Sequence, residues 1–338
     1  MLINREQLLK ELDSVSAGLS TREIIEQSSC FAFTKKRVMT FNDDVACVHS
    51  TSLKIKGAVP SAPLLNILRK LTDDELNIIC VQGEEGSSLE ISTKRKKVTI
   101  RIEDEIMLPI NTVETAEEWK KLPSDFEEAI RIIKECAGTD ETKFNLTCIN
   151  ITPKWIEACD GYRLARWSMP IKIAEPIQVR ADTIRHVLAL GMIEFGETDS
   201  WLHFRNDDGL VMSCRKYKTD YVNLSKHLKV TGSPITLPKN LVEGIEAADV
   251  FSSESVEGSN QITVLLKQNK IKIVGEGVNG KYEQVGKVKY NGPKIKFLIS
   301  PTILIDILQK HTTAELSDSK LKVQVGKYRY VTAISSQE

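Results

Sequence analysis

The segment VPSAPLLNIL at residues 59–68 returns as VRADTIRHVL at 179–188 and again as ISPTILIDIL at 299–308. Each copy begins 120 residues after the preceding one, and each has apolar residues at its first, sixth, ninth and tenth positions. This spacing predicts a helix with one buried face in every copy. A fixed period of this length predicts three similar folding units.

A second amphipathic pattern precedes each copy. Its apolar residues follow an i, i+4, i+7 spacing and are Leu8, Leu12 and Val15, then Phe126, Ile130 and Ile133, then Leu241, Ile245 and Ala248. Strand-like segments follow each predicted helix, so the order helix, strands, helix, strands predicts an α+β fold. Proline and capping residues near Pro123 and Pro238 predict helix starts. The predicted domains are 1–120, 121–233 and 234–338.

Composition limits the class of protein. Hydrophobic residues make up 41% of the 338 residues and charged residues 27%, which is typical of a soluble globular chain without a membrane span. The first residues lack a secretory signal, so a cytoplasmic location is expected. Lysine plus arginine equals aspartate plus glutamate at 46 each. Zero net charge disfavours tight static binding to many phosphates, but is compatible with a basic surface that acidic residues balance elsewhere.

The sequence carries no recognisable catalytic or metal-binding motif. The five histidines lack metal-ligand spacing, and the phosphate-binding and dinucleotide-binding loop patterns are missing. The segment GEGVNG at 275–280 predicts a turn. Cys159 lies beside Asp160 but has no identified base partner. Seven scattered cysteines without a C-x-x-C pair predict reduced, mostly buried thiols. We therefore expect no enzyme activity, no cofactor and no metal.

The sharpest local motif is CDGYRLA at residues 159–165. Its Asp-Gly dipeptide predicts a tight hairpin turn. The motif also resembles the Thr-Asp-Gly-His-Arg-Leu-Ala segment in the middle domain of the bacterial sliding clamps, the β subunits of the replicative DNA polymerase III. The segment REQLLK at 5–10, Asp220-Tyr221 and Tyr330-Val331 are similar to the same family, so the resemblance covers nearly the whole chain.

The resemblance implies both a fold and a function. It implies three DNA-clamp domains, each with two helices packed on a β-sheet, and a homodimer that closes head to tail into a six-domain ring. Helices of such a ring line a hole through which double-stranded DNA passes. The implied function is that of a processivity factor, which tethers the polymerase, the clamp loader and other partners through short peptide motifs.

Basic residues on or beside the repeat helices are the candidate DNA contacts. They are Arg22, Arg69, Lys70, Lys10, Arg131, Lys134, Arg180 and Lys239, together with the loop site Lys143 and Phe144. Arg185 and Lys310 lie on the same predicted helices. The alternative for each of these charges, favoured for any single residue, is an ordinary solvated residue of a helix face. Asp182 stands where the family commonly has a basic residue, so we expect a less positive lining.

The resemblance also implies a pocket for partner peptides. Carried over residue by residue, it consists of Cys159, Gly161, Tyr162, Arg163, Leu164, Thr219, Leu224, Ala333, Ile334 and Ser335. The family usually ends in Met-Pro-Met-Arg-Leu, whereas this chain ends in TAISSQE at 332–338. Thr219 replaces a proline and Tyr162 a histidine. These departures predict an altered peptide preference.

Closure of a ring needs an interface between the first and third domains. Val250 and Phe251, expected to follow the helix that begins near Leu241, are candidates to meet Val98 or Ile100 of another subunit. The alternative is that Val250 and Phe251 are core residues. Two other functions stay open: a clamp-fold peptide-binding adaptor that does not encircle DNA, and a nucleic-acid-processing enzyme with an unrecognised site.

Overall fold

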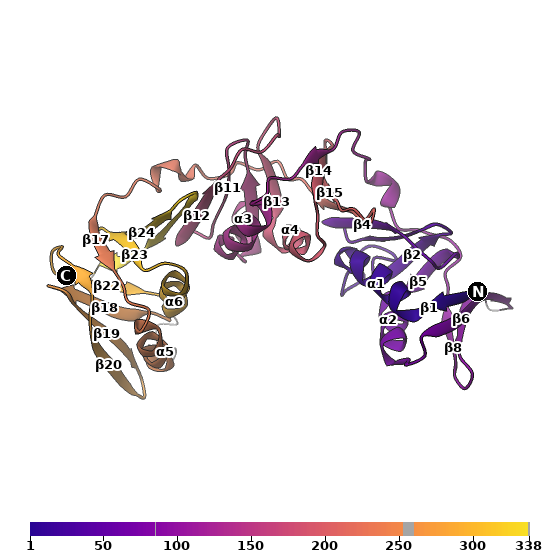
Figure 1. Cartoon of the computed structure of the whole chain (residues 1–338), viewed down its shortest axis with the longest axis horizontal. Helices are drawn as coiled ribbons and strands as arrows, with labels where there is room; N and C mark the ends of the chain where they lie inside the picture. Colours follow the sequence, from indigo (N-terminus) through magenta and orange to yellow (C-terminus); the bar gives the residue numbers. More distant parts are fainter. Residues whose placement is uncertain (85, 253–259, 337–338) are drawn as a thin grey trace. The chain divides into compact units, whose positions relative to one another are not determined.

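The structure is a computed structural model that describes residues 1–84, 86–252 and 260–336 (Figure 1). Helices and antiparallel sheets alternate along the chain, which confirms the predicted α+β class. The chain divides into two compact units. The first unit contains Met1–Glu135, Cys148–Lys154 and Pro170–Thr219, and the second contains Cys136–Thr147, Trp155–Met169 and Asp220–Glu338.

The first unit is built on two sheets. One has the order β5 (Lys56–Pro60), β2 (Cys30–Thr34), β3 (Arg37–Phe41), β4 (Val45–Ser50), β16 (Val211–Arg215), β15 (Trp201–Arg205), β14 (Glu194–Glu197) and β9 (Lys120–Lys121). The other has the order β1 (Leu2–Asn4), β6 (Glu75–Gly83), β7 (Gly86–Ser92) and β8 (Lys97–Arg101). A further pair joins β10 (Cys148–Ile151) to β13 (Ile177–Arg180).

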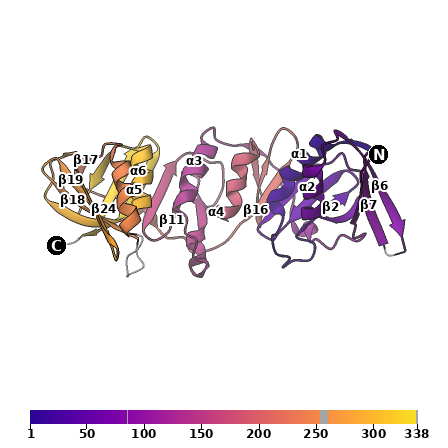
Figure 2. The same cartoon turned by 90° about the horizontal axis from the view of Figure 1, so that it is seen from below.

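Helices α1 (Arg5–Val15) and α2 (Ser61–Lys70) lie side by side against β3, β4 and β5 (Figure 2). The Asn4 side chain caps α1 by accepting a hydrogen bond from the Gln7 amide at 2.9 Å. Leu8, Leu12 and Val15 are fully buried, as their spacing predicts. The predicted helix at 126–133 is α3 (Phe126–Ile133). It packs against the 3-10 turn η5 (Arg185–Ala189), which continues α4 (Ala181–Ile184).

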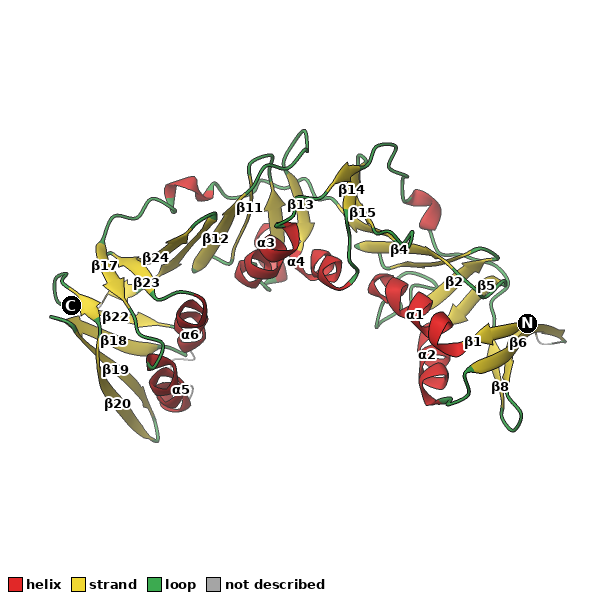
Figure 3. Ribbon diagram, in the orientation of Figure 1, coloured by secondary structure: helices red, strands yellow, loops and turns green. Residues whose placement is uncertain are grey.

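The second unit repeats this design. One sheet has the order β11 (Trp155–Cys159), β12 (Arg163–Ser168), β25 (Tyr328–Ala333), β24 (Lys320–Val325), β23 (Thr313–Leu316), β17 (Ser233–Thr236) and β21 (Lys289–Tyr290). The other has the order β20 (Gly280–Lys287), β19 (Lys270–Gly277), β18 (Ile262–Lys267), β22 (Ile295–Ile299) and β26 (Ser335–Ser336). Helices α5 (Leu241–Ser252) and α6 (Pro301–Lys310) lie side by side, and α5 packs on β18, β19 and β20 (Figure 3). The remaining 3-10 turns are η1 (Ser16–Gly18), η2 (Ile110–Thr112), η3 (Lys134–Cys136), η4 (Glu141–Thr147) and η6 (Leu224–Lys226).

The 120-residue repeat is a strand that leads into a helix. Its first position ends up in β5, β13 and β22, and its sixth position is buried in α2, α4 and α6. The middle copy differs, because its helix α4 gives way to η5 after four residues. The strand-like segments expected after the predicted helices are present, among them β2, β4, β8, β10, β16, β18 and β24.

The compact units do not coincide with the three predicted domains, since strands pair across the predicted boundaries. In the first unit β4 pairs with β16, and in the second unit β12 pairs with β25. Each unit therefore joins residues from two of the predicted domains. The division into three domains therefore remains a prediction that is based on the sequence repeat.

Two predictions from composition concern the interior. All seven cysteines are free and all except Cys80 are buried, as expected for reduced thiols in a core. None of the helices in the described ranges is long and apolar enough to cross a membrane.

Candidate functional site

The motif at residues 159–165 forms a hairpin turn between β11 and β12. Asp160 Oδ1 accepts hydrogen bonds from the amides of Tyr162 at 2.9 Å and Arg163 at 2.8 Å. Gly161 has φ 97°, a conformation that favours glycine. The Arg163 Nε donates to Asp160 Oδ2 at 3.0 Å. The turn prediction is confirmed, and the turn leaves the Tyr162 side chain 74% exposed.

A pocket of about 220 Å³ lies beside this turn, entirely within the second unit. It is lined by Leu146, Cys159, Gly161, Tyr162, Arg163, Leu164, Val222, Leu224, His227, Lys320, Val331 and Ala333. Seven of these are among the residues predicted for the peptide pocket. Four of the lining side chains, those of Cys159, Leu164, Leu224 and Val331, also belong to a buried apolar cluster with Leu228 and Val230. The pocket therefore opens onto hydrophobic core.

Three predicted pocket residues do not line this cavity. Ile334 is buried, and Ser335 belongs to β26, which pairs with β22. Thr219 belongs to the first unit, where its amide donates to Gln178 Oε1 at 3.1 Å.

Five lining residues were not predicted: Leu146, Val222, His227, Lys320 and Val331. Val331 was noted only as part of a family-like strand end. Lys320 begins an alternating strand pattern, a signal that predicts β24 but says nothing about a pocket.

The polypeptide around the pocket is held by backbone and side-chain bonds. The Ala333 amide donates to the Tyr162 carbonyl at 2.7 Å, and Leu164 pairs with Val331 in the β12–β25 register. Burial raises the pKa of the Cys159 thiol above its ordinary value, so this side chain is protonated at neutral pH and acts as part of an apolar wall.

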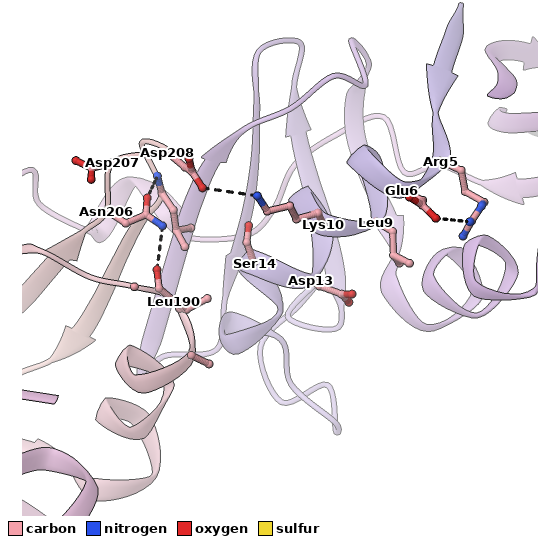
Figure 4. A pocket seen from close by; sticks show the side chains of 13 residues that line it. Arg5, Glu6, Leu9, Lys10, Asp13, Ser14, Leu190, Asn206, Asp207 and Asp208 are labelled. Carbon is pink, nitrogen blue, oxygen red and sulfur yellow. Dashed lines mark hydrogen bonds and ion pairs between the residues drawn. The ribbon is translucent and has the colours of Figure 1, made fainter. Parts of the chain in front are cut away.

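The helix face of the first unit carries a groove of about 790 Å³, shown in Figure 4. Residues of α1 form one side, and the segments 189–191 and 206–208 form the other. Lys10, a predicted DNA contact, lies here with its ammonium 3.8 Å from Asp208 Oδ2. Four carboxylates line the groove, those of Glu6, Asp13, Asp207 and Asp208, against the two cations Arg5 and Lys10. The groove is therefore net acidic.

Other predicted DNA contacts are paired with carboxylates as well. Arg69 donates to Asp13 at 2.7 Å, Arg180 lies 3.6 Å from Asp44, and Lys134 pairs with Glu135. Arg185 lies 3.9 Å from Asp182, and Lys310 pairs with Asp306. Exposed pairs contribute little to stability, but each carboxylate neutralises a cation that would otherwise face an anion.

Five predicted contacts keep a free charge within residues 1–84, 86–252 and 260–336. Arg22, Lys70, Arg131, Lys143 and Lys239 are exposed and form no ion pair with a described carboxylate. Phe144 lies half-buried beside Lys143 in η4. The structure thus distributes the predicted contacts between neutralised and free cations.

The predicted interface residues lie on one edge strand, β8, and one helix, α5. Strand β8 is an outer strand of its sheet; Val98 is half-buried there, while Ile100 is only 7% exposed. Val250 and Phe251 do not follow the helix, because α5 continues through both to Ser252. Val250 is 62% exposed, and Phe251 packs against Gly280, where an added Cβ would lie 2.9 Å from the Phe251 ring.

The described residues contain no group of three or more histidine, cysteine, aspartate or glutamate side chains that could hold a metal ion. The buried histidine, His203, instead bonds two hydroxyl groups. Its Nδ1 lies 2.7 Å from Ser213 Oγ, and its Nε2 lies 3.1 Å from Thr198 Oγ1.

The sequence matches no family model and no curated protein. Solved structures are similar over the whole chain. The DNA polymerase III beta chain of Streptococcus pneumoniae has a TM-score of 0.84 at 15% identity, covering 100% of this chain and 99% of that one. The DNA polymerase III subunit beta of Pseudomonas aeruginosa has a TM-score of 0.81 at 18% identity and covers 100% of both. A sliding clamp of Pseudomonas aeruginosa bound to griselimycin has a TM-score of 0.80 at 17% identity, covering 100% of this chain and 99% of that one.

These likenesses agree with the paired helices and the repeated strand-to-helix unit. The chain has the fold of the bacterial DNA polymerase III beta subunits, the sliding clamps.

Proposed function

We propose that the chain is a DNA polymerase processivity factor of three clamp domains, 1–120, 121–233 and 234–338. Two copies close head to tail around double-stranded DNA in the cytoplasm, and the pocket of the second unit tethers the polymerase and the clamp loader. The role is non-catalytic, because a ring retained on DNA by topology needs no chemical step. The observation that carries the proposal is the clamp fold over the full length of the chain, combined with an open apolar pocket at the Asp-Gly turn.

Two sheet edges support head-to-tail closure. In the described chain β8 and β20 each end a sheet, so each leaves a row of backbone N–H and C=O groups that a strand of a second copy can pair. Lys94 and Arg95 are exposed in the turn before β8, and Glu243 and Glu246 are exposed on α5 beside β20. The cations of this turn are opposite in sign to these carboxylates of α5, which favours their contact between the first end of one copy and the last end of another.

The pocket supports the tethering role. Its volume of about 220 Å³ is below the ~300–1,000 Å³ of sites that enclose a whole small molecule, so it suits one or two side chains of a peptide. Apolar anchors in such pockets commonly dominate the affinity of short segments.

One observation favours a second candidate function, that of a peptide-binding adaptor that does not encircle DNA. Lys10, Arg69, Lys134 and Arg180 are each paired with a carboxylate. A face with neutralised cations attracts phosphates weakly. The adaptor would keep the pocket and lose the ring.

Retention on circular DNA separates the two functions. The chain is mixed with a nicked circular plasmid at a concentration at which the dimer dissociates, and is then concentrated so that rings close around the DNA without a loader. Gel filtration measures the protein that elutes with the plasmid before and after a restriction enzyme linearises it.

A clamp stays with the circle and leaves the linear form, and its free mass by sedimentation is twice the 37.9 kDa of one chain. Equal retention on both forms, or a free protein that is monomeric at all concentrations, would contradict the ring and leave the adaptor.

A further inference from the structure

The rim of the pocket in the second unit is basic. Three of its lining residues, Arg163, His227 and Lys320, are of the basic residue types. Among the described residues that line the pocket none carries a carboxylate. Lys226 and Lys229 flank His227 in sequence and are exposed. A ligand with a negative charge therefore meets complementary charge at this rim.

Of the two lining residues that carry a permanent positive charge, Arg163 and Lys320, only Lys320 is available to a partner. The Arg163 guanidinium is already paired with Asp160 at 3.0 Å. Two residues along β24, Lys322 pairs with Glu315 at 3.4 Å. Lys320 is half-buried, its backbone is fixed by bonds to Ser317, and its ammonium has no carboxylate within 4.0 Å in the described part of the chain. A half-buried cation without a counter-ion gains more from an incoming carboxylate than a fully solvated one does.

The pocket thus combines an apolar floor with a cation on its wall. Leu164, Leu224 and Val331 provide the floor, and the exposed Tyr162 and Val222 extend the apolar surface toward solvent. This pairing selects for two features in one segment, an apolar anchor and an acidic neighbour, because only a segment with both satisfies floor and wall together.

We propose that the pocket selects partner segments in which an aspartate or glutamate side chain flanks the apolar anchor, with Lys320 as the selecting residue and His227 as its neighbour. This proposal rests on the peptide-binding role proposed above and adds the chemical class of the partner. The Lys320 ammonium binds the carboxylate while the anchor occupies the floor.

The test uses fluorescence anisotropy with the full chain and two labelled, amidated peptides, Ser-Asp-Leu-Leu-Ser and Ser-Asn-Leu-Leu-Ser. We expect the aspartate peptide to bind about three- to tenfold more tightly than the asparagine peptide, as for a partly buried charge pair. K320M keeps the aliphatic stem and removes the charge, so it should bring the two affinities to within about twofold. K296M is the matched control: it makes the same change of charge on β22, outside the pocket, and should preserve the preference.

The possible failures are distinguishable. Equal affinity of the two peptides for the wild type, with binding lost in V222D, keeps the peptide pocket but overturns the acidic selectivity. A third peptide, Ser-Asn-Leu-Leu, has a free terminal carboxylate but no acidic side chain. If only this peptide binds tightly, the pocket selects a chain terminus, and the proposed preference for an aspartate or glutamate side chain is overturned. If no peptide binds at all, the peptide-binding role and the selectivity both fail, while retention on circular DNA still tests the ring.

Discussion

The carboxylate of Glu157 lies 2.6 Å from the guanidinium of Arg166, at facing positions of β11 and β12. Both side chains are nearly inaccessible, at 5% and 8% exposure. The Arg166 guanidinium also lies 4.1 Å from the centroid of the Trp155 ring and donates to Ser225 Oγ at 3.2 Å. Because β11 and β12 carry the Asp-Gly turn, this buried pair stabilises the hairpin from which the pocket is formed.

Breaking this pair should be costly. In E157Q the buried guanidinium of Arg166 loses its compensating charge, and removal of one partner of a buried ion pair typically costs about 3–5 kcal/mol. Urea unfolding followed by tryptophan fluorescence measures the change. The double variant E157L/R166M replaces both charges with apolar groups and should fall much closer to the wild type. A loss below about 1 kcal/mol in E157Q would show that water or another group already compensates Arg166.

His203 makes the first unit sensitive to acid. Burial lowers the pKa of this histidine to about 4, with the charge of Lys216 acting in the same direction and Glu114 opposing it. The unfolded chain has an ordinary histidine pKa of about 6.5, so between pH 6.5 and 4 the unfolded state binds the proton first. Stability therefore falls as the pH falls through this window, by roughly 3 kcal/mol in total from this group.

H203Q isolates the contribution of this histidine. The amide has no titration in the window, so the variant should lose less stability than the wild type between pH 6.5 and 4.5 in urea unfolding. The glutamine can bond Ser213 and Thr198 as the neutral imidazole does. Parallel pH profiles for both proteins would mean that His203 is protonated in the folded chain without cost.

The repeat could be found in the sequence because buried positions constrain the residue type. Val59, Val179 and Ile299 each lie in a strand. The apolar residues five positions later, Leu64, Ile184 and Leu304, are each buried in the helix that follows. The shortening of the middle helix to α4 and η5 could not be predicted from apolar spacing, since Val187 is buried in η5 just as it would be in an α-helix.

The turn was predicted from its Asp-Gly dipeptide and most pocket residues from the resemblance of the motif to the clamp family, but Lys320 was not predicted. Asp160 and Gly161 define the turn by local hydrogen bonds and a positive φ, and such local rules are visible in a sequence. Lys320 reaches the same pocket only because β12 pairs with β25 and β25 with β24. Long-range strand register of this kind leaves no signal at the residue itself.

Neutralised cations on the helix face predict an unusual response to mutation. In D13N/D208N the side chains of Arg69 and Lys10 lose their carboxylate partners, at 2.7 and 3.8 Å, and become available to phosphates. Each cation that gains a phosphate contact steepens the slope of log K against log salt by about 0.9 on double-stranded DNA. We therefore expect the variant to bind DNA more tightly at low salt, with a slope steeper by up to about 2.

D73N is the matched control, because Asp73 pairs with Lys96 beside β8 and is not on a helix. Filter binding over a series of salt concentrations, with equal protein mass, measures both slopes. Identical slopes in D13N/D208N and D73N would exclude Lys10 and Arg69 from the surface that faces DNA.

The exposed end of α5 offers the sharpest probe of ring closure. Val250 is 62% exposed on this helix, beside the edge strand β20, whereas the neighbouring Phe251 packs on Gly280 within the same chain. A substitution at Phe251 would remove an internal contact as well as any external one, so Val250 tests the interface more cleanly.

V250R places a charge in the apolar centre of the proposed head-to-tail interface, where an unpaired charge is strongly disfavoured. We expect the sedimentation mass to fall from twice 37.9 kDa toward one chain at micromolar concentration, with unchanged urea unfolding of the monomer. V325R, at a 47% exposed valine at the end of β24, makes the same change away from both sheet edges and should stay dimeric. A dimer that survives V250R would remove α5 from the interface and leave the backbone edges of β8 and β20 to close the ring alone.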